Sequence, residues 1–165
     1  MSDAVTLRQA TADDAALYEA MTTEFESYIC GLTGDALSDD TRKPWAEIFL
    51  REACGPDPCF HCRIAEADGE AVGFYTYYVG FDADFSLRTL FLPDVFVRPG
   101  ARRAGIGRAL MADAAEQARA RGIELIVWSV WKKNPDAMAF YESLGAKLAR
   151  DEIPTYWPRA AWPAP

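Results

Sequence analysis

Hydrophobic positions along this 165-residue chain switch between the two-residue period of strands and the three-to-four-residue period of helices. Residues 5–11 alternate apolar and polar side chains, which predicts a first strand. Across residues 12–28 the apolar side chains recur at helical spacing, and we expect Gly31 and Gly34 to end this helix.

The same pattern predicts the remaining elements in order. They are a helix over 38–53, a β-hairpin over 59–81 that turns at Asp68-Gly69, a strand over 86–100, a helix over 106–122, a strand over 123–131, a helix over 134–145 and one or two strands over 146–157. The run over 123–131 is apolar throughout, which indicates a buried strand. Asn134 and Pro135 begin the short helix and Gly145 closes it. Strands that alternate with helices in this way predict an α/β fold with a mixed sheet. We expect one domain over residues 1–165, because the chain has no linker or internal repeat.

Pro93 interrupts the strand predicted over residues 86–100. Proline lacks the N–H that a central ladder needs, so a bulge or a splayed edge is expected there.

The charge balance argues against one class of partner. A formal net charge of −8 and a sequence pI of about 4.7 make nucleic acid an unexpected ligand. The N-terminal stretch has no apolar signal core, and the longest apolar run is too short to cross a bilayer. A cytoplasmic protein with no membrane partner is therefore expected.

The four cysteines and the one histidine do not suggest a metal site. Cys59 and Cys62 in CFHC resemble half of such a site, but the sequence has no second half. His61 has no nucleophile around it, and we interpret it as an ordinary strand residue. Free thiols in a reducing compartment and no bound metal are expected.

The stretch RRAGIGRALM, residues 102–111, places two glycines and three arginines at the start of a predicted helix. A strand, a glycine turn and a helix N-terminus form an anion cradle, because backbone N–H groups point outward and the helix dipole adds positive charge. The stretch is not a P-loop, since Arg108-Ala109 follows Gly107 in place of Lys and Ser/Thr. It is a poor dinucleotide fingerprint, since the third glycine would fall at Leu110. Taken alone, the glycines also fit a close crossing of helix and strand.

The segment VFVRPGARRAGIGRALM followed by NPDAMAFYESLGAKL resembles the GNAT N-acetyltransferase superfamily. The coenzyme A loop of that superfamily reads Gln/Arg-x-x-Gly-x-Gly/Ala, and Arg102, Gly105 and Gly107 occupy its three specified positions. Asn134 and the segment FYESLGA match the second signature, an Asn-capped helix that carries a tyrosine. The segments LRQATADD, PCFHCRIAE, VGFYTYYVGFD, DVFVRP and GAKLARDE are similar to the diamine N-acetyltransferase branch, which includes the spermidine/spermine and thialysine enzymes.

This resemblance implies the GNAT fold, in which about four helices flank a mixed sheet of six to seven strands with splayed central strands. It implies acetyl-CoA as donor, a primary amine of a small molecule as acceptor, direct attack of that amine, and no metal. It also implies a homodimer.

The resemblance assigns the coenzyme to a splayed strand and the loop after it. The pantetheine arm would bond the backbone of the strand, the Val95 amide would polarise the thioester carbonyl, and the pyrophosphate would lie on the N–H groups of residues 103–108. The cofactor-binding residues so implied are Val95, Phe96, Val97, Arg102, Arg103, Ala104, Gly105, Ile106, Gly107, Arg108, Asn134, Ala137 and Tyr141.

Tyr141 matches the family tyrosine and is the candidate general acid for the leaving thiolate. It lies seven residues after Asn134, about two helical turns, so both face one side. A core tyrosine packed on the sheet is the alternative. Asp94 matches an acidic position and is the second catalytic candidate, as an anchor or base for the amine, although it could instead bond loop N–H groups. Glu24, Tyr28, Asp82 and Asp94 are expected on the acceptor side.

Three departures from the diamine branch bear on the acceptor. The Glu-Asp of the branch is Pro93-Asp94 here, its Tyr-Glu at the end of the first helix is Tyr28-Ile29, and its tryptophan before the Asn is Lys133. Two acidic contacts are lost and a positive charge is gained, which favours a diamine-like or amino-acid-like acceptor smaller than spermidine or spermine.

Three other functions stay open at this point. They are acetylation of a protein N-terminus or lysine, acyl-CoA binding without catalysis, and nucleotide binding by an α/β protein of another kind.

Overall fold

The computed structural model describes residues 5–34, 43–83 and 85–148. The chain divides into two compact units, Met1–Ser129 and Val130–Pro165, and each is described by itself. Six strands are present among the described residues: β1 (Thr6–Gln9), β2 (His61–Ala67), β3 (Glu70–Asp82), β4 (Leu87–Leu92), β5 (Val95–Val97) and β6 (Leu125–Trp128). The described part of the chain also contains four α-helices: α1 (Ala15–Thr33), α2 (Trp45–Glu52), α3 (Ile106–Arg119) and α4 (Pro135–Glu142).

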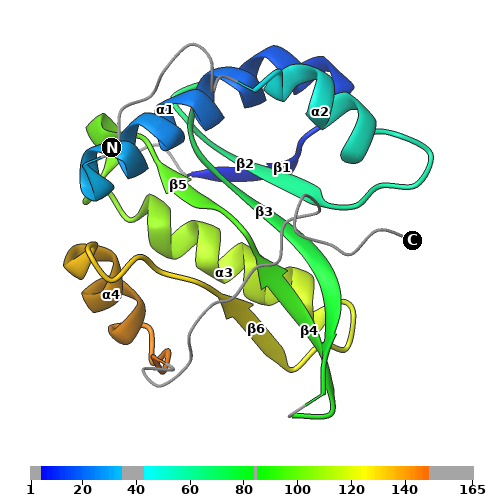
Figure 1. Cartoon of the computed structure of the whole chain (residues 1–165), viewed down its shortest axis with the longest axis vertical. Coiled ribbons are helices and arrows are strands. Elements are labelled where there is room, and N and C mark those ends of the chain that lie inside the picture. Colours follow the sequence, from blue (N-terminus) through cyan, green and yellow to red (C-terminus); the bar gives the residue numbers. More distant parts are fainter. Residues whose placement is uncertain (1–4, 35–42, 84, 149–165) are drawn as a thin grey trace, which may run out of the picture. The chain divides into compact units, whose positions relative to one another are not determined.

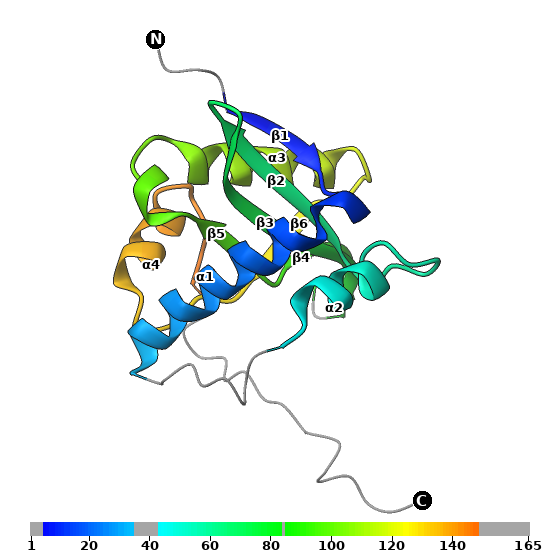
Figure 2. The ribbon, with the colours of Figure 1, turned by 90° about the horizontal axis from the view of Figure 1, so that it is seen from above.

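The first unit is built around one mixed sheet. The strand order is β1-β2-β3-β4-β6, and β5 pairs with β3 beside that path. All these pairs are antiparallel except β4 with β6, which is parallel. The helices α1 and α2 lie on one face of the sheet and α3 lies on the other (Figures 1 and 2). The expectation of an α/β fold, with a mixed sheet of six to seven strands and about four helices, is confirmed by the six strands and four helices of the described residues.

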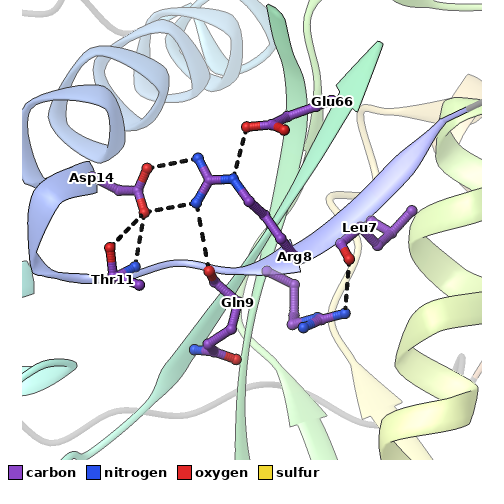
Figure 3. A network of polar contacts seen from close by, with 7 residues as sticks. Leu7, Arg8, Gln9, Thr11, Asp14 and Glu66 are labelled. Carbon is purple, nitrogen blue, oxygen red and sulfur yellow. Dashed lines mark hydrogen bonds and ion pairs between the residues drawn. The ribbon is translucent and has the colours of Figure 1, made fainter. Parts of the chain in front are cut away.

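A network of charges connects the end of β1 to the start of α1 (Figure 3). The carboxylate of Asp14 accepts hydrogen bonds from the backbone N–H of Thr11 and from both terminal nitrogens of Arg8, at 2.7–2.8 Å. Arg8 also donates from Nε to Glu66 of β2 at 2.7 Å. The hydrogen bond from Arg8 is the main reason that the pKa of Asp14 lies below its usual value. These contacts fix the point at which α1 leaves the sheet.

The β2–β3 hairpin turns where the sequence predicts it. Asp68 and Gly69 have φ values of 53° and 78°, the left-handed conformation that a tight hairpin turn requires at both positions.

The strand predicted over residues 86–100 is two strands, β4 and β5, separated at Pro93. Tyr78 of β3 pairs with Phe91, whereas Tyr75 pairs with Val95. Three steps along β3 (78 − 75) are therefore matched by four on the facing strands (95 − 91), which is the extra residue of a β-bulge. The bulge expected from Pro93 is confirmed.

The bulge separates β5 from β6. β6 runs parallel to β4 as far as Leu92 and Trp128. Beyond that point β5 continues along β3, and no pairing joins β5 to β6 within the described residues. The splayed strands expected from the resemblance are therefore confirmed.

Two helix and strand boundaries correct the sequence predictions. Gly31 does not break α1, which ends at Gly34, where φ is 82° and the N–H donates to the Cys30 carbonyl at 2.9 Å. β6 is half-buried along its length and not the fully buried strand expected over 123–131, because it pairs on only one side among the described residues.

The other boundaries agree where the structure describes them. α2 begins after Pro44, and residues 38–42 of the predicted second helix lie outside the described residues. Residues 146–148 form no strand, and the rest of the strands expected over 146–157 lies outside the described residues.

Aromatic side chains fill the core between α1, α2 and the sheet. The ring of Tyr18 stacks on Phe49 of α2, with 4.6 Å between centroids, and meets Phe74 of β3 edge-on at 5.8 Å. Phe25 contacts Phe96 of β5 at 5.5 Å. α1 is therefore anchored to both β3 and the short strand β5.

A partly buried ion pair holds α3 against the opposite face of the sheet. Arg63 of β2 makes two hydrogen bonds of 2.8 Å to the carboxylate of Asp113, and the hydroxyl of Tyr75 donates to it at 2.7 Å. Burial would raise the pKa of Asp113, but the hydrogen bonds from Arg63 and Tyr75 outweigh it and keep the pKa below its usual value.

Gly73 of β3 generates a test of how β5 is placed. A Cβ at this position would lie 2.6 Å from the Phe96 carbonyl oxygen and 3.4 Å from a methyl of Leu110, so β5 would have to move. We expect Gly73→Ala to lower the free energy of unfolding by about 1–3 kcal/mol in urea titrations. Gly100→Ala is the matched control, since its Cβ would meet nothing within 4 Å. Equal stability of the two variants would contradict this packing.

Candidate coenzyme and acceptor site

The outer edge of β5 carries main-chain groups that the sheet does not use. On its inner edge the Asp94 carbonyl accepts from Thr76 N–H at 3.0 Å, and the Arg98 N–H donates to the Val72 carbonyl at 2.9 Å. Because main-chain groups alternate in direction along a strand, those of Val95 and Val97 point to the outer edge. Within the described residues no strand pairs with that edge.

One side chain already uses the outer edge. The Val97 carbonyl accepts a hydrogen bond from Nε of Arg102 at 3.1 Å. This contact independently shows that the polar groups of Val97 face away from β3.

The loop after β5 continues this edge into the start of α3. Arg103 and Gly105 both have left-handed backbone, with φ values of 66° and 84°, and Gly105 is the residue before the first turn of α3. The side chains of residues 102–104 are exposed, and the space where a Gly105 Cβ would lie is open to 4 Å. The first N–H groups of α3 have no partners within the helix. Turned backbone followed by a helix N-terminus is a site that binds anions.

Two arginines of this loop are held by α1. The guanidinium of Arg98 forms a two-point ion pair with Glu24, at 2.8 and 3.0 Å, and also donates to the Ala71 carbonyl. The guanidinium of Arg102 lies over the ring of Tyr28, 4.3 Å from its centroid. Glu24 and Tyr28, expected on the acceptor side, therefore contact the loop assigned to the coenzyme.

Asp94 lies at the bulge and is bound tightly to Thr76. Its Oδ2 accepts from the Thr76 hydroxyl at 2.8 Å, and its own N–H donates to that hydroxyl oxygen at 3.2 Å. Burial raises the pKa of Asp94, the hydrogen bond from Thr76 opposes the rise, and the negative charge of Glu26 adds to it. A carboxylate with a raised pKa is suited to hold or receive a proton.

The Asp94 carboxylate lies on the face of the sheet that α1 covers. Thr76 and Phe74 are two residues apart on β3 and so point to the same face. Phe74 contacts Tyr18 and Phe25 of α1, at 5.8 and 6.4 Å between ring centroids. Burial, and then the charge of Asp94, raise the pKa of the Tyr18 hydroxyl.

Asp82 does not join this group. It lies six residues beyond Thr76 on β3, about 20 Å along the strand. Its carboxylate accepts from the Phe85 N–H at 3.1 Å and so stabilises the turn between β3 and β4. The acceptor role expected for Asp82 stays a prediction.

Asn134, Ala137 and Tyr141 belong to the second unit and are described within it. The side chain of Asn134 accepts from the Ala137 N–H at 3.2 Å, so the predicted cap of α4 is confirmed. Tyr141 lies two turns later and is buried, with its ring 5.2 Å from that of Phe140. The assignment of these residues to the coenzyme stays a prediction.

The described residues contain no group of three or more His, Cys, Asp or Glu side chains that could hold a metal ion. All four cysteines are free thiols. His61 packs on Tyr77 at 5.0 Å, and burial lowers its pKa. No helix in the described part of the chain is long and apolar enough to span a membrane.

Sequence reasoning missed three residues at this site. Thr76 binds Asp94, Arg98 binds Glu24, and the negative charge of Glu26 helps to raise the pKa of Asp94. The pairs are 18 and 74 residues apart for the first two, so no local pattern signals them. The bulge at Pro93 is the one local signal that pointed to this part of the sheet.

Comparison with known proteins decides the family. Residues 16–146 match the Acetyltransferase (GNAT) family. This chain belongs to the GNAT acetyltransferase family. The acetyltransferase is 30% identical over 151 residues to the thialysine N-epsilon-acetyltransferase of Sus scrofa, an alignment that covers 87% of this chain and 84% of the relative. It is 35% identical over 91 residues to the aminoalkylphosphonate N-acetyltransferase of Salmonella typhimurium, covering 55% of this chain and 59% of the relative.

Solved structures show the same fold. An integron cassette protein from V. cholerae superposes with a TM-score of 0.74 at 24% identity, covering 98% of this acetyltransferase and 95% of that chain. The ribosomal-protein-alanine N-acetyltransferase of Brucella melitensis gives 0.70 at 21% identity, covering 93% and 100%. Membership of the GNAT family sets aside the nucleotide-binding alternative.

The burial of Asp94 predicts how stability depends on pH. The pKa of Asp94 is raised above the usual 3.8 in the folded chain, so the unfolded chain releases the carboxyl proton at lower pH than the folded chain does. The contribution of Asp94 to the free energy of unfolding is therefore lost as the pH rises through the folded pKa. We expect Asp94→Asn, whose amide oxygen can still accept from Thr76, to increase the free energy of unfolding at neutral pH, and the gain to shrink toward acid pH. Urea titrations across this pH range measure it. Asp57→Asn, an exposed loop position, is the control. A neutral-pH loss of stability in Asp94→Asn would refute the assignment.

Proposed function

We propose that this GNAT acetyltransferase moves the acetyl group of acetyl-CoA to a primary amine of a small molecule by direct attack. The observation that carries the proposal is the unpaired outer edge of β5, which continues through the left-handed turn of Arg103 and Gly105 into the start of α3.

The residues of the first unit fit the chemistry of coenzyme A along this line. The outward N–H and C=O groups of Val95 and the outward N–H of Val97 match the amides of a pantetheine arm, as an added strand would. The exposed turn and the first N–H groups of α3 match a pyrophosphate. When bound, acetyl-CoA supplies an activated thioester. The Val95 N–H is the donor we assign to its carbonyl oxygen.

Asp94 is the residue we assign to the attacking amine. A primary amine reaches the enzyme largely protonated and must lose a proton before it attacks. In the chain, Asp94 directly precedes Val95, the residue whose N–H we assign to the carbonyl oxygen. Its raised pKa favours the acceptance of that proton, and Thr76 orients the carboxylate.

Tyr141 is the proposed general acid. A thiol has a usual pKa of about 8.5 and a phenol one of about 10, so the tyrosine hydroxyl can protonate the leaving sulfur as the charge develops. The position of Tyr141 two turns after the Asn134 cap, as in the family signature, supports the assignment.

The names of the relatives support a small amine as acceptor. They are enzymes named for thialysine, for aminoalkylphosphonate and, in Arabidopsis thaliana, for L-ornithine. Each of these acceptors carries a primary amine on a small, charged molecule. Acetylation of a protein N-terminus or lysine remains the alternative, and a substrate panel that includes peptides separates the two.

Gly105 gives a test of coenzyme binding in which shape is matched and only charge differs. Asn and Asp both tolerate left-handed backbone, and the space around this position is open. We expect Gly105→Asp to weaken acetyl-CoA binding about tenfold or more relative to Gly105→Asn, because a carboxylate repels the pyrophosphate. Isothermal titration calorimetry measures both dissociation constants. Equal constants would show that no anion binds at this turn.

Tyr141→Phe tests the acid. We expect kcat to fall roughly a hundredfold or more while the KM for acetyl-CoA changes little, because only proton transfer is removed. Steady-state rates across a pH series give the measurement. Tyr78→Phe, at an exposed position on β3, is the control. A Tyr141→Phe enzyme with unchanged kcat at every pH would rule out the acid role.

A further inference from the structure

Two of the arginines that follow β5 contact α1, and the helix holds them in different ways. Arg98 forms a two-point ion pair with the carboxylate of Glu24, at 2.8 and 3.0 Å, so the two formal charges offset each other. One helical turn later, Tyr28 contacts Arg102, whose guanidinium carbon lies 4.3 Å from the centroid of the ring. An aromatic face attracts a guanidinium but carries no net charge, so the positive charge of Arg102 stays available to a ligand.

The Tyr28 ring is a fixed support for that guanidinium. Tyr28 is half-buried and packs against the hydrophobic core cluster that contains Tyr18, Phe74 and Phe96. Arg102, by contrast, is exposed. An exposed arginine loses rotamer freedom when it binds a ligand, and a contact that restricts the side chain beforehand lowers that cost. The contact with Tyr28 therefore pre-organises Arg102.

A hydrogen bond to Val97 determines which edge of the Arg102 guanidinium is left for a ligand. Nε of Arg102 donates to the Val97 carbonyl at 3.1 Å. The other four N–H groups belong to the two terminal nitrogens, and within the described residues these nitrogens have no hydrogen-bond partner. The edge between the terminal nitrogens can donate two parallel hydrogen bonds, which matches the geometry of a phosphate group.

The Arg102 guanidinium lies where the two parts of the proposed coenzyme site meet. Val97 is the last residue of β5, and its carbonyl belongs to the outer edge of that strand. The left-handed turn begins at Arg103, directly after Arg102. A ligand that follows the outer edge of β5 and places an anion at the turn would therefore pass the terminal nitrogens of Arg102.

We propose that Tyr28 is a positioning residue for coenzyme A: it holds Arg102 so that the terminal nitrogens bind the pyrophosphate together with the backbone N–H groups of the turn. This inference rests on the coenzyme part of the proposed function. It gives Tyr28 a role on the coenzyme side in place of the acceptor contact that the sequence suggests, because a guanidinium already occupies the ring. Glu24 neutralises Arg98, whereas Tyr28 leaves the charge of Arg102 for the ligand.

Calorimetric titration of coenzyme A into Tyr28 variants tests the role of the ring. We expect Tyr28→Leu to weaken binding about two- to fivefold, because the cation–π contact is lost. Tyr28→Phe keeps an aromatic face and should retain nearly the wild-type dissociation constant. A Tyr28→Leu variant that binds as the wild type does, or equal losses in the Leu and Phe variants, would overturn the proposal.

A double-mutant cycle shows whether Tyr28 acts through Arg102. Arg102→Gln should weaken coenzyme A binding about tenfold or more, because charge-assisted hydrogen bonds are lost. In the Arg102→Gln background, Tyr28→Leu should have little further effect. The same loss in both backgrounds would indicate a general effect on the fold and would refute the coupling. Arg88→Gln, at an exposed position on β4, controls for the loss of one positive charge.

Dephospho-coenzyme A, which lacks the 3′-phosphate, identifies the phosphate group that Arg102 binds. Equal losses for both ligands in Tyr28→Leu support the pyrophosphate, whereas a loss confined to coenzyme A would contradict it. In steady-state assays, Tyr28→Leu should raise the KM for acetyl-CoA and leave kcat and the KM for the amine unchanged. A rise in the KM for the amine alone would return Tyr28 to the acceptor side.

The outcomes separate this inference from the proposed function. A wild type that bound no coenzyme A would defeat the proposed function, and the role of Tyr28 with it. A wild type that binds coenzyme A, with a Tyr28→Leu variant that binds it equally well, would remove only the role of Tyr28. The outer edge of β5 and the turn would then still account for coenzyme binding.

Discussion

One missing hydrogen-bond donor determines the layout of the functional part of the first unit. Pro93 has no N–H. At this point β4 and β5 together contain one residue more than the stretch of β3 that pairs with them. β5 stays in the sheet through β3 alone, while β6 follows β4 and ends its pairing at Leu92. The main-chain groups of Val95 and Val97 are therefore left for something other than a strand of the sheet. An extended ligand with its own amides fits that requirement better than a compact one.

The helix α1 links the two halves of the proposed site because of its periodicity. At about 100° per residue, Glu24 and Tyr28 fall on one flank of its buried face and Glu26 falls on the other. The first flank contacts Arg98 and Arg102 in the loop after β5, and the second contacts Trp45 of α2. The aromatic core around Tyr18 holds the helix between them. A shift of α1 would thus change the coenzyme side and the acceptor side together.

Local signals in the sequence predicted the parts of the site whose causes are local. Pro93 indicated the bulge, and Asn134 indicated the α4 cap. The helix ran past Gly31 because nothing there demands left-handed backbone, whereas Gly34 adopts it. The partners of Glu24 and Asp94 depend on which strand lies beneath α1. The fold topology determines that strand, and residues adjacent in the sequence do not. The ion pair of Glu24 with Arg98, 74 residues away in the sequence, follows from the same topology, and the acceptor role expected for Glu24 stays a prediction.

At the proposed acceptor position, the surroundings of Asp94 lower the stability of the fold and favour proton transfer. Burial beside Glu26 makes the charged form of Asp94 unfavourable, and one hydrogen bond from Thr76 only partly compensates. A carboxylate in that position attracts cations more strongly and takes a proton more readily than an exposed one would. In the proposed function, an incoming ammonium would act on Asp94 first as a counter-ion and then as a proton source. In the proposed reaction, the amine that has given up its proton would attack the acetyl group held at the unpaired edge of β5.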